Sequence, residues 1–326
     1  MGLLTSSVAS AQTTPATRSA FTTAAGDTGL WFVPTAEVLA KGTWSASGYR
    51  VSTNYVQGYT NVSEFPLTFA WGVSSRVEAF GAFAAVTRID RDLRSLFQPD
   101  PNVGGVVGGY PYVWKPWTGS KVGDTTVGAK INLLSEGQRK PLALAIRGIV
   151  KIPTGNKDAG VSTGKADTYL DFVVSKEVPR VAEISGYAGG AFRSSTTEVT
   201  QSNGLRWGIG AGFPSRSPLK FTTELNGEKP FDNTITVKTP IVGIDKTQAL
   251  GIYTLQSYTA ATVGLTLQLP NGFFAGLGMT KAYPARDRGA FKTDSDPSTD
   301  FLDYQIRIGY HPGVRRYVAP PPPAPP

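Results

Sequence analysis

Cysteine is absent from the 326-residue sequence, and histidine and methionine are rare, with 1 and 2 copies. The absence of cysteine excludes disulfide bonds, and it is compatible with an exported bacterial protein as well as with a cytosolic one. No run of 18 or more apolar residues occurs, so no segment is long and apolar enough for a transmembrane helix. Charged residues make up only 17% of the chain, against about 25% in ordinary soluble domains.

The charge balance is basic, with 32 lysine and arginine residues against 24 acidic ones and a net charge of +8. Such a balance is typical of proteins that bind nucleic acid or anionic lipid. The basic residues are scattered along the chain, however, and no pattern of a common nucleic-acid-binding module occurs. We therefore expect no nucleic-acid partner.

Catalytic motifs are also missing. The single histidine, His311, has no convincing nucleophile to pair with, and no second histidine exists to replace it. The run AGVSTGKAD (159–167) approaches a phosphate-binding loop, but Ala159 replaces its first glycine and Ala166 its hydroxyl residue. We therefore expect no enzymatic activity, no cofactor, and no catalytic or metal site.

The first residues have the composition of the end of a signal peptide. Leu3 and Leu4, followed by a run of small residues that ends at Ala11, resemble an apolar region with an export cleavage site. The alternative is a disordered N-terminus rich in serine, threonine and alanine. We assign residues 1–28 to a residual signal peptide and a disordered N-terminus.

The only helical signal lies in residues 29–42. Thr35 is a candidate N-cap for residues 36–40, and Gly42 is a candidate stop. Because so short a helix needs something to pack against, we expect this entry segment to lie under or inside the structure that follows.

From residue 43 onward, apolar and polar residues alternate, as they do in a strand whose two faces have different surroundings. In the last such segment, Leu302 and Ile306 lie on one face. Asp303 and Arg307 lie on the other face. Each segment has about the 10 residues that a tilted membrane strand needs. The twelve segments are 43–53, 64–73, 75–87, 124–134, 140–152, 167–178, 182–194, 203–213, 218–229, 257–269, 271–282 and 301–311.

The apolar faces of the clearest segments carry no charge; Phe65, Leu67 and Phe69 share one such face. A lysine or arginine that faces the middle of a bilayer costs about 2–4 kcal/mol, so a lipid-facing surface should be free of charge. Two residues depart from the pattern, because Arg50 and Phe80 lie on faces where neither fits.

The connections between the segments alternate in length without exception. The short ones are 74–75, 135–139, 179–181, 214–217 and 270. The long ones are 54–63, 88–123, 153–166, 195–202, 230–256 and 283–300. This alternation is typical of bacterial outer-membrane barrels, which have short periplasmic turns and long extracellular loops. With an even number of strands, both termini lie on the side of the short turns, which we assign to the periplasm.

Residues 43–311 are therefore predicted to form an all-β, antiparallel up-and-down transmembrane barrel of about 12 strands. A spanning sheet must close, because in lipid every backbone polar group needs a partner within the protein. Loop 230–256 also alternates, and it extends a hairpin above the membrane or, if it spans, raises the count to 14. A soluble β-sandwich is a third alternative.

Charges of both signs lie on the inward faces in nearly equal numbers. Because an unpaired charge in a narrow site is costly, we expect ion pairs across a narrow or plugged lumen. A solvated channel with unpaired charges is the alternative. The predicted lumen charge network is Glu64, Arg76, Glu78, Lys130, Arg147, Lys151, Asp171, Glu183, Arg193, Arg206, Lys220, Glu224, Glu228, Asp303 and Arg307.

Loop 88–123 is unusually long and carries aromatic residues among glycines. Long loops in compact folds are usually functional or disordered. We expect this loop either to enter the lumen as a constriction or to form an aromatic contact patch on the cell surface. Its aromatic residues are Tyr110, Tyr112, Trp114 and Trp117.

The run LALAIRGIVKIPTGNKDAGVSTGKADTYLDFVVSKEV (142–178) resembles the barrels of the phenol meta-pathway transporter family, in which a strand ends in a K-x-P-T-G loop. The run GLWFVPTAEVLAKGTW (29–44) is similar to the entry to the first strand in several barrel families. The first resemblance implies a porin-like channel or transporter for small solutes, with hydrophobic compounds among them.

After the barrel, residues 312–326 (PGVRRYVAPPPPAPP, from Pro312) form a proline-rich spacer. A barrel with such a linker resembles the OmpA family, which implies a structural anchor with a narrow or plugged lumen that holds a periplasmic module. We favour this anchor and keep the channel as the alternative. Expected partners are outer-membrane lipid and lipopolysaccharide, with peptidoglycan or a periplasmic complex reached through the linker.

Overall fold

A computed structural model describes residues 19–93, 95–283 and 302–312. Most of the predicted export segment and most of the proline-rich linker lie outside the described residues, and both stay predictions. Within the described part, twelve strands close into one antiparallel barrel in the order β1-β14-β13-β12-β9-β8-β7-β6-β5-β4-β3-β2. The predicted fold class is confirmed.

The strands have nearly the bounds that the alternation of residues predicts. The first six are β1 (Trp44–Tyr55), β2 (Thr60–Gly72), β3 (Val77–Arg91), β4 (Thr125–Leu134), β5 (Ala143–Ile152) and β6 (Asp167–Val178). The other six are β7 (Ala182–Phe192), β8 (Gly204–Phe213), β9 (Leu219–Pro230), β12 (Tyr258–Gln268), β13 (Phe273–Tyr283) and β14 (Leu302–Tyr310). Two 3-10 turns connect strands: η1 (Gln57–Tyr59) and η2 (Glu136–Gln138).

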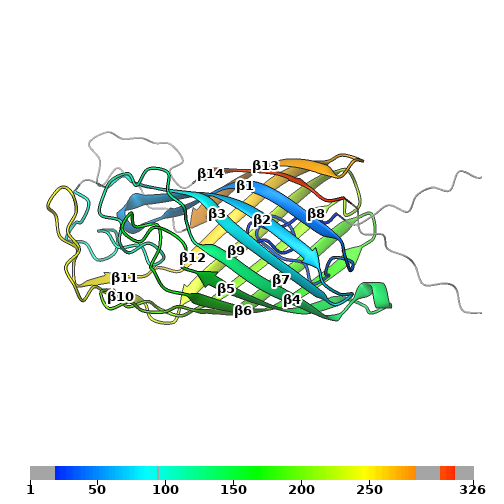
Figure 1. The fold of residues 1–326 in the computed structure, drawn as a ribbon, viewed down its shortest axis with the longest axis horizontal. Helices are drawn as coiled ribbons and strands as arrows, with labels where there is room; N and C mark the ends of the chain where they lie inside the picture. Colours follow the sequence, from blue (N-terminus) through cyan, green and yellow to red (C-terminus); the bar gives the residue numbers. More distant parts are fainter. Residues whose placement is uncertain (1–18, 94, 284–301, 313–326) are drawn as a thin grey trace, which may run out of the picture.

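A separate two-stranded sheet consists of β10 (Thr234–Thr236) and β11 (Ile252–Thr254). β10 and β11 belong to the connection between β9 and β12, and β9 and β12 pair directly with each other. β10 and β11 therefore lie beyond the barrel wall (Figure 1). Loop 230–256 therefore extends a hairpin, and the alternative count of 14 spanning strands is wrong. No helix among the described residues is long and apolar enough to cross a membrane.

One predicted long loop is short. Strands β1 and β2 pair as far as Tyr55 and Thr60, so the connection shrinks from the predicted 54–63 to residues 56–59. Gly58 makes this tight turn possible, because its φ of 65° lies in the left-handed region that glycine adopts without steric cost. The alternation of loop lengths therefore has this one exception.

Both ends of the described chain meet at the end of the barrel that carries the short turns. His311 is buried after β14, and its ring lies 6.4 Å from the ring of Phe21 and 5.8 Å from that of Phe274. Its backbone N–H donates to the carbonyl of Gly272 in the β12–β13 turn, at 3.1 Å. The single histidine is a packed residue at this end.

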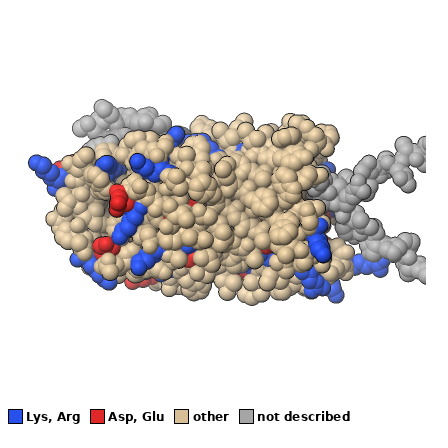
Figure 2. All heavy atoms as spheres, in the orientation of Figure 1, with Lys and Arg blue, Asp and Glu red and all other residues tan. Residues whose placement is uncertain are grey.

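The outer surface of the barrel is a band of exposed apolar side chains. Leu67, Phe69 and Phe172 are 57%, 48% and 67% exposed, and all three point away from the lumen. In Figure 2, lysine and arginine gather toward the two ends of the barrel, and the middle of the visible face is largely free of charge. An exposed apolar surface of this extent indicates contact with lipid.

Replacing Phe172 with arginine tests this band. Because the side chain projects from the middle of β6, we expect Phe172→Arg to lower the free energy of unfolding from lipid vesicles by about 2–4 kcal/mol. The measurement is denaturant unfolding followed by tryptophan fluorescence, with Phe172→Leu as the control that keeps an apolar side chain. Equal stability of the two variants would show that this face is not in lipid.

Candidate functional site

Residues 19–42, called the plug below, lie inside the barrel near the short-turn end (Figure 1). The side chains of Trp31, Val33 and Ala36 are fully buried there. Two predictions for this part of the chain are wrong. Residues 19–28 are ordered and mostly buried rather than disordered, and residues 29–42 contain no helix. The expectation that the entry segment lies inside the following structure agrees with its position.

One carboxylate of the wall holds three consecutive backbone amides of the plug. The amides of Trp31, Phe32 and Val33 donate to the Glu224 carboxylate at 2.7, 2.9 and 2.7 Å. Hydrogen bonds to a charged acceptor are stronger than those to a neutral one. The plug backbone is therefore turned toward β9, and a helical hydrogen-bonding pattern is lost at these residues.

A second wall carboxylate holds the plug at two points, one before and one after residues 31–33 in the sequence. Glu78 of β3 accepts hydrogen bonds from the amides of Thr28 and Leu39, each at 2.8 Å. Its partner is the fully buried Lys130, at 3.0 Å, whose ammonium group also donates to the carbonyl of Thr28. One wall carboxylate thus joins two parts of the plug that lie eleven residues apart in sequence.

A chain of alternating charges links the plug to β5, β6 and β8. Asp27 of the plug lies 3.2 Å from Arg147, and Arg147 lies 2.8 Å from Asp171. Arg206 adds a fourth member, 3.2 Å from Asp171. Asp27 was missed by the sequence prediction because it lies in the segment assigned as disordered, which has no periodicity to place it.

Glycines on the inward faces of β12 and β13 make room for the largest plug side chain. A Cβ atom at Gly264 would lie 2.2 Å from Nε1 of Trp31, and one at Gly276 would lie 3.1 Å from its ring. The guanidinium of Arg307 lies over the same ring, 4.3 Å from the centroid, and donates to the carbonyl of Leu30 at 2.7 Å. Trp31 therefore occupies a socket with a cationic wall.

The remaining predicted network residues form short-range pairs along the wall. The pairs are Lys220 with Glu183 at 3.1 Å, Arg193 with Glu228 at 2.7 Å, Lys151 with Asp167 at 2.6 Å, and Glu64 with the Tyr110 hydroxyl at 3.0 Å. The ion pairs that were predicted across a narrow or plugged lumen are thus found between nearby strands, and other charges contact the plug.

One predicted member lies outside the lumen interior. Arg76 is exposed in the turn between β2 and β3, where it donates to Gln138, so its assignment to the lumen is corrected. Asp303 of β14 lies on the same face as buried Gln305 and Arg307, and it accepts hydrogen bonds from Asn54 and Asn61.

At the long-loop end, residues 95–124, 193–203 and 231–257 pack together as a unit, called the cap below. A buried apolar cluster joins them; its residues are Leu96, Phe97, Val106, Val199, Ile235, Val237, Ala249 and Tyr253. Buried Arg91 supports the cap from the end of β3 by donating to the carbonyls of Val113 and Gly105. The long loop is therefore packed over the mouth of the barrel.

The four predicted loop aromatics do not gather in one patch. The Tyr110 hydroxyl reaches Glu64 inside the barrel. Tyr112 donates to Glu198 at 2.9 Å, and Trp114 donates to the carbonyl of Asp158, so these two join loops to one another. Trp117 is half exposed. Within the described residues, Tyr110 fits the alternative in which the loop reaches the lumen, and the four aromatics form no single surface patch.

Between the plug and the cap lies a cavity of about 410 Å³, called the chamber below. Its lining includes Ala24, Ala25 and Phe32 on the plug side and Gly109, Tyr110 and Val161 on the loop side. Its polar and aromatic wall consists mainly of Glu64, Asp124, Lys151, Asp167, Tyr169, Tyr187 and Arg206. Two rings, those of Tyr169 and Tyr187, lie 4.8 and 5.4 Å from the Arg206 guanidinium.

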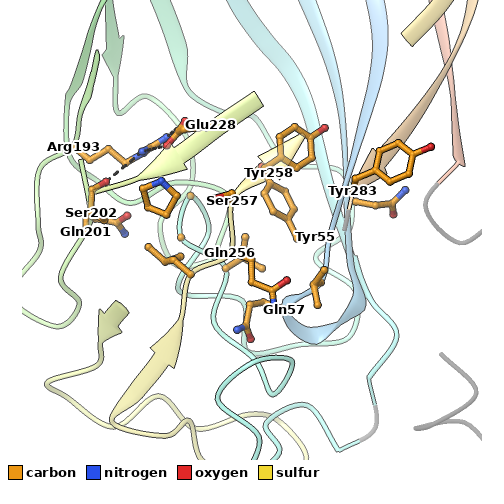
Figure 3. Close-up of a pocket in the computed structure, with 17 residues that line it drawn as sticks. Tyr55, Gln57, Arg193, Gln201, Ser202, Glu228, Gln256, Ser257, Tyr258 and Tyr283 are labelled. Carbon is orange, nitrogen blue, oxygen red and sulfur yellow. Dashed lines mark hydrogen bonds and ion pairs between the residues drawn. The ribbon is translucent and has the colours of Figure 1, made fainter. Parts of the chain in front are cut away.

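A second cavity, of about 190 Å³, adjoins the chamber, because Tyr55, Gly109 and Arg193 line both. In Figure 3, Arg193 and Glu228 lie at one side of this cavity, and Tyr283 lies at the other. The rings of Tyr55 and Tyr258 lie between them, with centroids 6.1 Å apart. The two cavities together extend from the lumen to the rim of the wall.

No protein-family model matches this chain, and no curated protein matches it. Among solved structures, an outer-membrane channel from Pseudomonas putida F1 is similar over 85% of this chain and 97% of that chain, with a TM-score of 0.55 and 12% identity. The CymD monoaromatic hydrocarbon channel aligns over 86% and 90%, with a TM-score of 0.40 and 8% identity. The chain has the fold of a bacterial outer-membrane barrel. The OmpA-family resemblance stays a prediction.

The hydrogen bonds between Glu224 and the plug can be tested by cysteine labelling, since the sequence has no cysteine. In an Ala36→Cys background, we expect Glu224→Gln to raise the rate of maleimide labelling about 10- to 100-fold. The expected increase follows because hydrogen bonds to a charged group contribute about 1.5–3 kcal/mol, and glutamine would weaken them. The matched control is Glu228→Gln on the same strand, whose carboxylate pairs with Arg193. Equal rates in both variants would contradict the role of Glu224.

The loop contact between Tyr112 and Glu198 predicts a pH effect outside the membrane. The hydrogen bond from the Tyr112 hydroxyl lowers the pKa of Glu198 to about 2. Because the pKa of Glu198 is lowered, its ionised carboxylate contributes its full stabilisation above the ordinary glutamate pKa of about 4.3. This stabilisation is lost as the carboxylate is protonated while pH falls through about 2. We expect Tyr112→Phe to raise the pKa of Glu198 toward about 4.3, as measured by carbon NMR of labelled glutamate. Trp117→Phe is the control, and an unchanged pKa in Tyr112→Phe would contradict the contact.

Proposed function

We propose that this protein is an outer-membrane channel for small solutes, closed by its plug in the described structure. The proposed orientation puts the short turns and both termini in the periplasm and the cap at the cell surface. The observation that carries the proposal is the chamber of about 410 Å³ between plug and cap. A barrel that served only as a membrane anchor would need no such space, and small barrels fill theirs with side chains.

The way the plug is held supports a closure that can be reversed. The plug precedes β1 and contributes no strand to the barrel wall, so its removal breaks no hydrogen bond between strands. Its polar contacts are made mostly with wall side chains, among them Glu224, Glu78 and Arg147. Such a segment can leave the lumen while the barrel stays closed around it.

The lining of the chamber suggests the class of solute. Tyr55, Tyr169 and Tyr187 offer aromatic surface, whereas Lys151 and Arg206 offer hydrogen-bond donors. Both basic side chains are already paired with acidic ones, which leaves no dominant charge for selecting ions of one sign. We propose small molecules with one apolar face and few polar groups, of a size that fits a cavity of about 410 Å³.

The structural anchor stays an alternative without support from the described residues, because residues 313–326 lie outside them. The partners that we propose for the channel are the lipids and lipopolysaccharide around its apolar band. We also propose that the barrel is not catalytic.

Single-channel conductance in planar bilayers tests the proposal. We expect the intact chain to show small or rare steps, and a variant without residues 19–41 to show frequent steps of larger conductance, because the main obstruction is then gone. A variant without residues 95–116 isolates the contribution of the cap.

The two deletions distinguish the candidate functions. Steps that appear on removal of the plug support a plugged channel. The absence of steps in all three proteins, each verified as folded by its heat-modifiable electrophoretic mobility, would contradict the channel and favour the anchor.

A further inference from the structure

Among the described residues, β1 and β14 are neighbouring strands of the barrel wall that are joined along only part of their length. β3 and β4 also pair over only part of theirs, but there the rest of β3 bonds to the backbone of cap residues 116–124. β14 pairs with β13 over all of Leu302–Tyr310. Its pairing with β1 on the other side covers only Ala46–Arg50 of β1. Toward the cap from Arg50, β1 continues to pair with β2 but no longer with β14. We call this part of the wall the seam.

Side chains replace the missing backbone ladder in the seam. The amide of Gln305 accepts from the backbone N–H of Ser52 at 3.1 Å and donates to the carbonyl of the same residue at 3.2 Å. The guanidinium of Arg50 donates to the backbone carbonyl of Tyr304. Three backbone groups that face the seam, the N–H and carbonyl of Ser52 and the carbonyl of Tyr304, thus have side-chain partners that can rotate away.

Polar side chains also gather at the seam and on the adjoining β2. Asn54 and Asn61 donate to the Asp303 carboxylate, and the hydroxyls of Ser52 and Ser63 lie 2.8 Å apart. Polar side chains within a membrane-spanning wall are costly in lipid and are often functional.

A cavity lies directly behind the seam. Asn54 and Tyr55 of β1 line the second cavity together with Tyr258 and Tyr283 of β12 and β13, the strands beyond β14 (Figure 3). This cavity adjoins the chamber at Arg193. A continuous run of cavity-lining residues therefore leads from the seam to the chamber, whereas the direct path along the barrel axis is covered by the cap.

We propose that the seam is a side opening, through which small amphipathic molecules pass between the outer edge of the membrane and the chamber. This inference rests on the proposed channel function and specifies its route. Separating β1 from β14 here breaks side-chain contacts and leaves the backbone pairs of both strands with β2 and β13 intact. The half-exposed rings of Tyr283 and Tyr304 lie beside the seam, as expected at a membrane interface.

A reversible cross-link across the seam tests the route. The double variant Asn54→Cys/Asp303→Cys, in full-length protein in the outer membrane, is closed with a short bismaleimide whose linker is cleavable by reductant. The measurement is the initial uptake of N-phenylnaphthylamine, an uncharged aromatic amine whose fluorescence rises in apolar surroundings. We expect the cross-link to abolish the protein-dependent uptake and reduction to restore it in the same cells.

The control cross-link joins β14 to its fully paired neighbour. Lys281→Cys/Leu302→Cys suits this purpose because the two residues are register partners on β13 and β14. Its cross-link with the same bismaleimide should leave uptake unchanged. Uptake that persists through the cross-linked seam would overturn the side opening and leave the channel proposal standing. Absence of protein-dependent uptake in every form would also overturn it, while the conductance of the plug-deletion variant decides independently whether the barrel is a channel.

Discussion

The requirement that every backbone polar group find a partner governs both the wall and the interior of this barrel. In the wall, twelve strands meet it by pairing with their neighbours until the sheet closes. In the lumen, the plug does not join that ladder, and it contains no helix that would pair its backbone groups internally. Wall carboxylates therefore take the place of carbonyl acceptors, and Glu224 and Glu78 together bind five plug amides. The charges of the lumen are thus partners of the plug backbone as much as of one another.

Burial of these charges is tolerable because each has several partners. The free energy needed to remove a carboxylate and a cation from water exceeds the attraction between them, unless both groups also form further hydrogen bonds. Lys130 meets this condition through Glu78 and the Thr28 carbonyl, and Arg147 meets it through Asp27 and Asp171. Two of these four partners belong to the plug. Its departure would leave wall charges incompletely paired, and only water that entered the opened lumen could replace it.

The wall was predictable from the sequence and the plug was not. A bilayer imposes a period of two on every strand, so the alternation of residues placed all twelve strands within a few residues of their bounds. The plug has no such period. Its helical signal at Thr35 was local, and tertiary contacts override it, because the amides of Ala36 and Leu39 donate to Ser175 and Glu78 instead. Asp27 carried no signal at all, since its role is defined only by Arg147 across the lumen.

Arg50 and Phe80 depart from the alternation of apolar and polar residues. Phe80 contacts the plug, and Arg50 contacts the seam. Phe80 faces inward because it packs in a buried cluster with Ala20 and Leu39 of the plug. Arg50 faces outward because its guanidinium binds the backbone of β14 where the ladder ends. In a barrel, an apolar residue that faces inward implies an apolar partner in the lumen. At Arg50, the outward charge serves a backbone carbonyl that has no partner in the β1–β14 ladder. Each departure from the alternation is thus explained by a specific partner, the plug for Phe80 and the neighbouring backbone for Arg50.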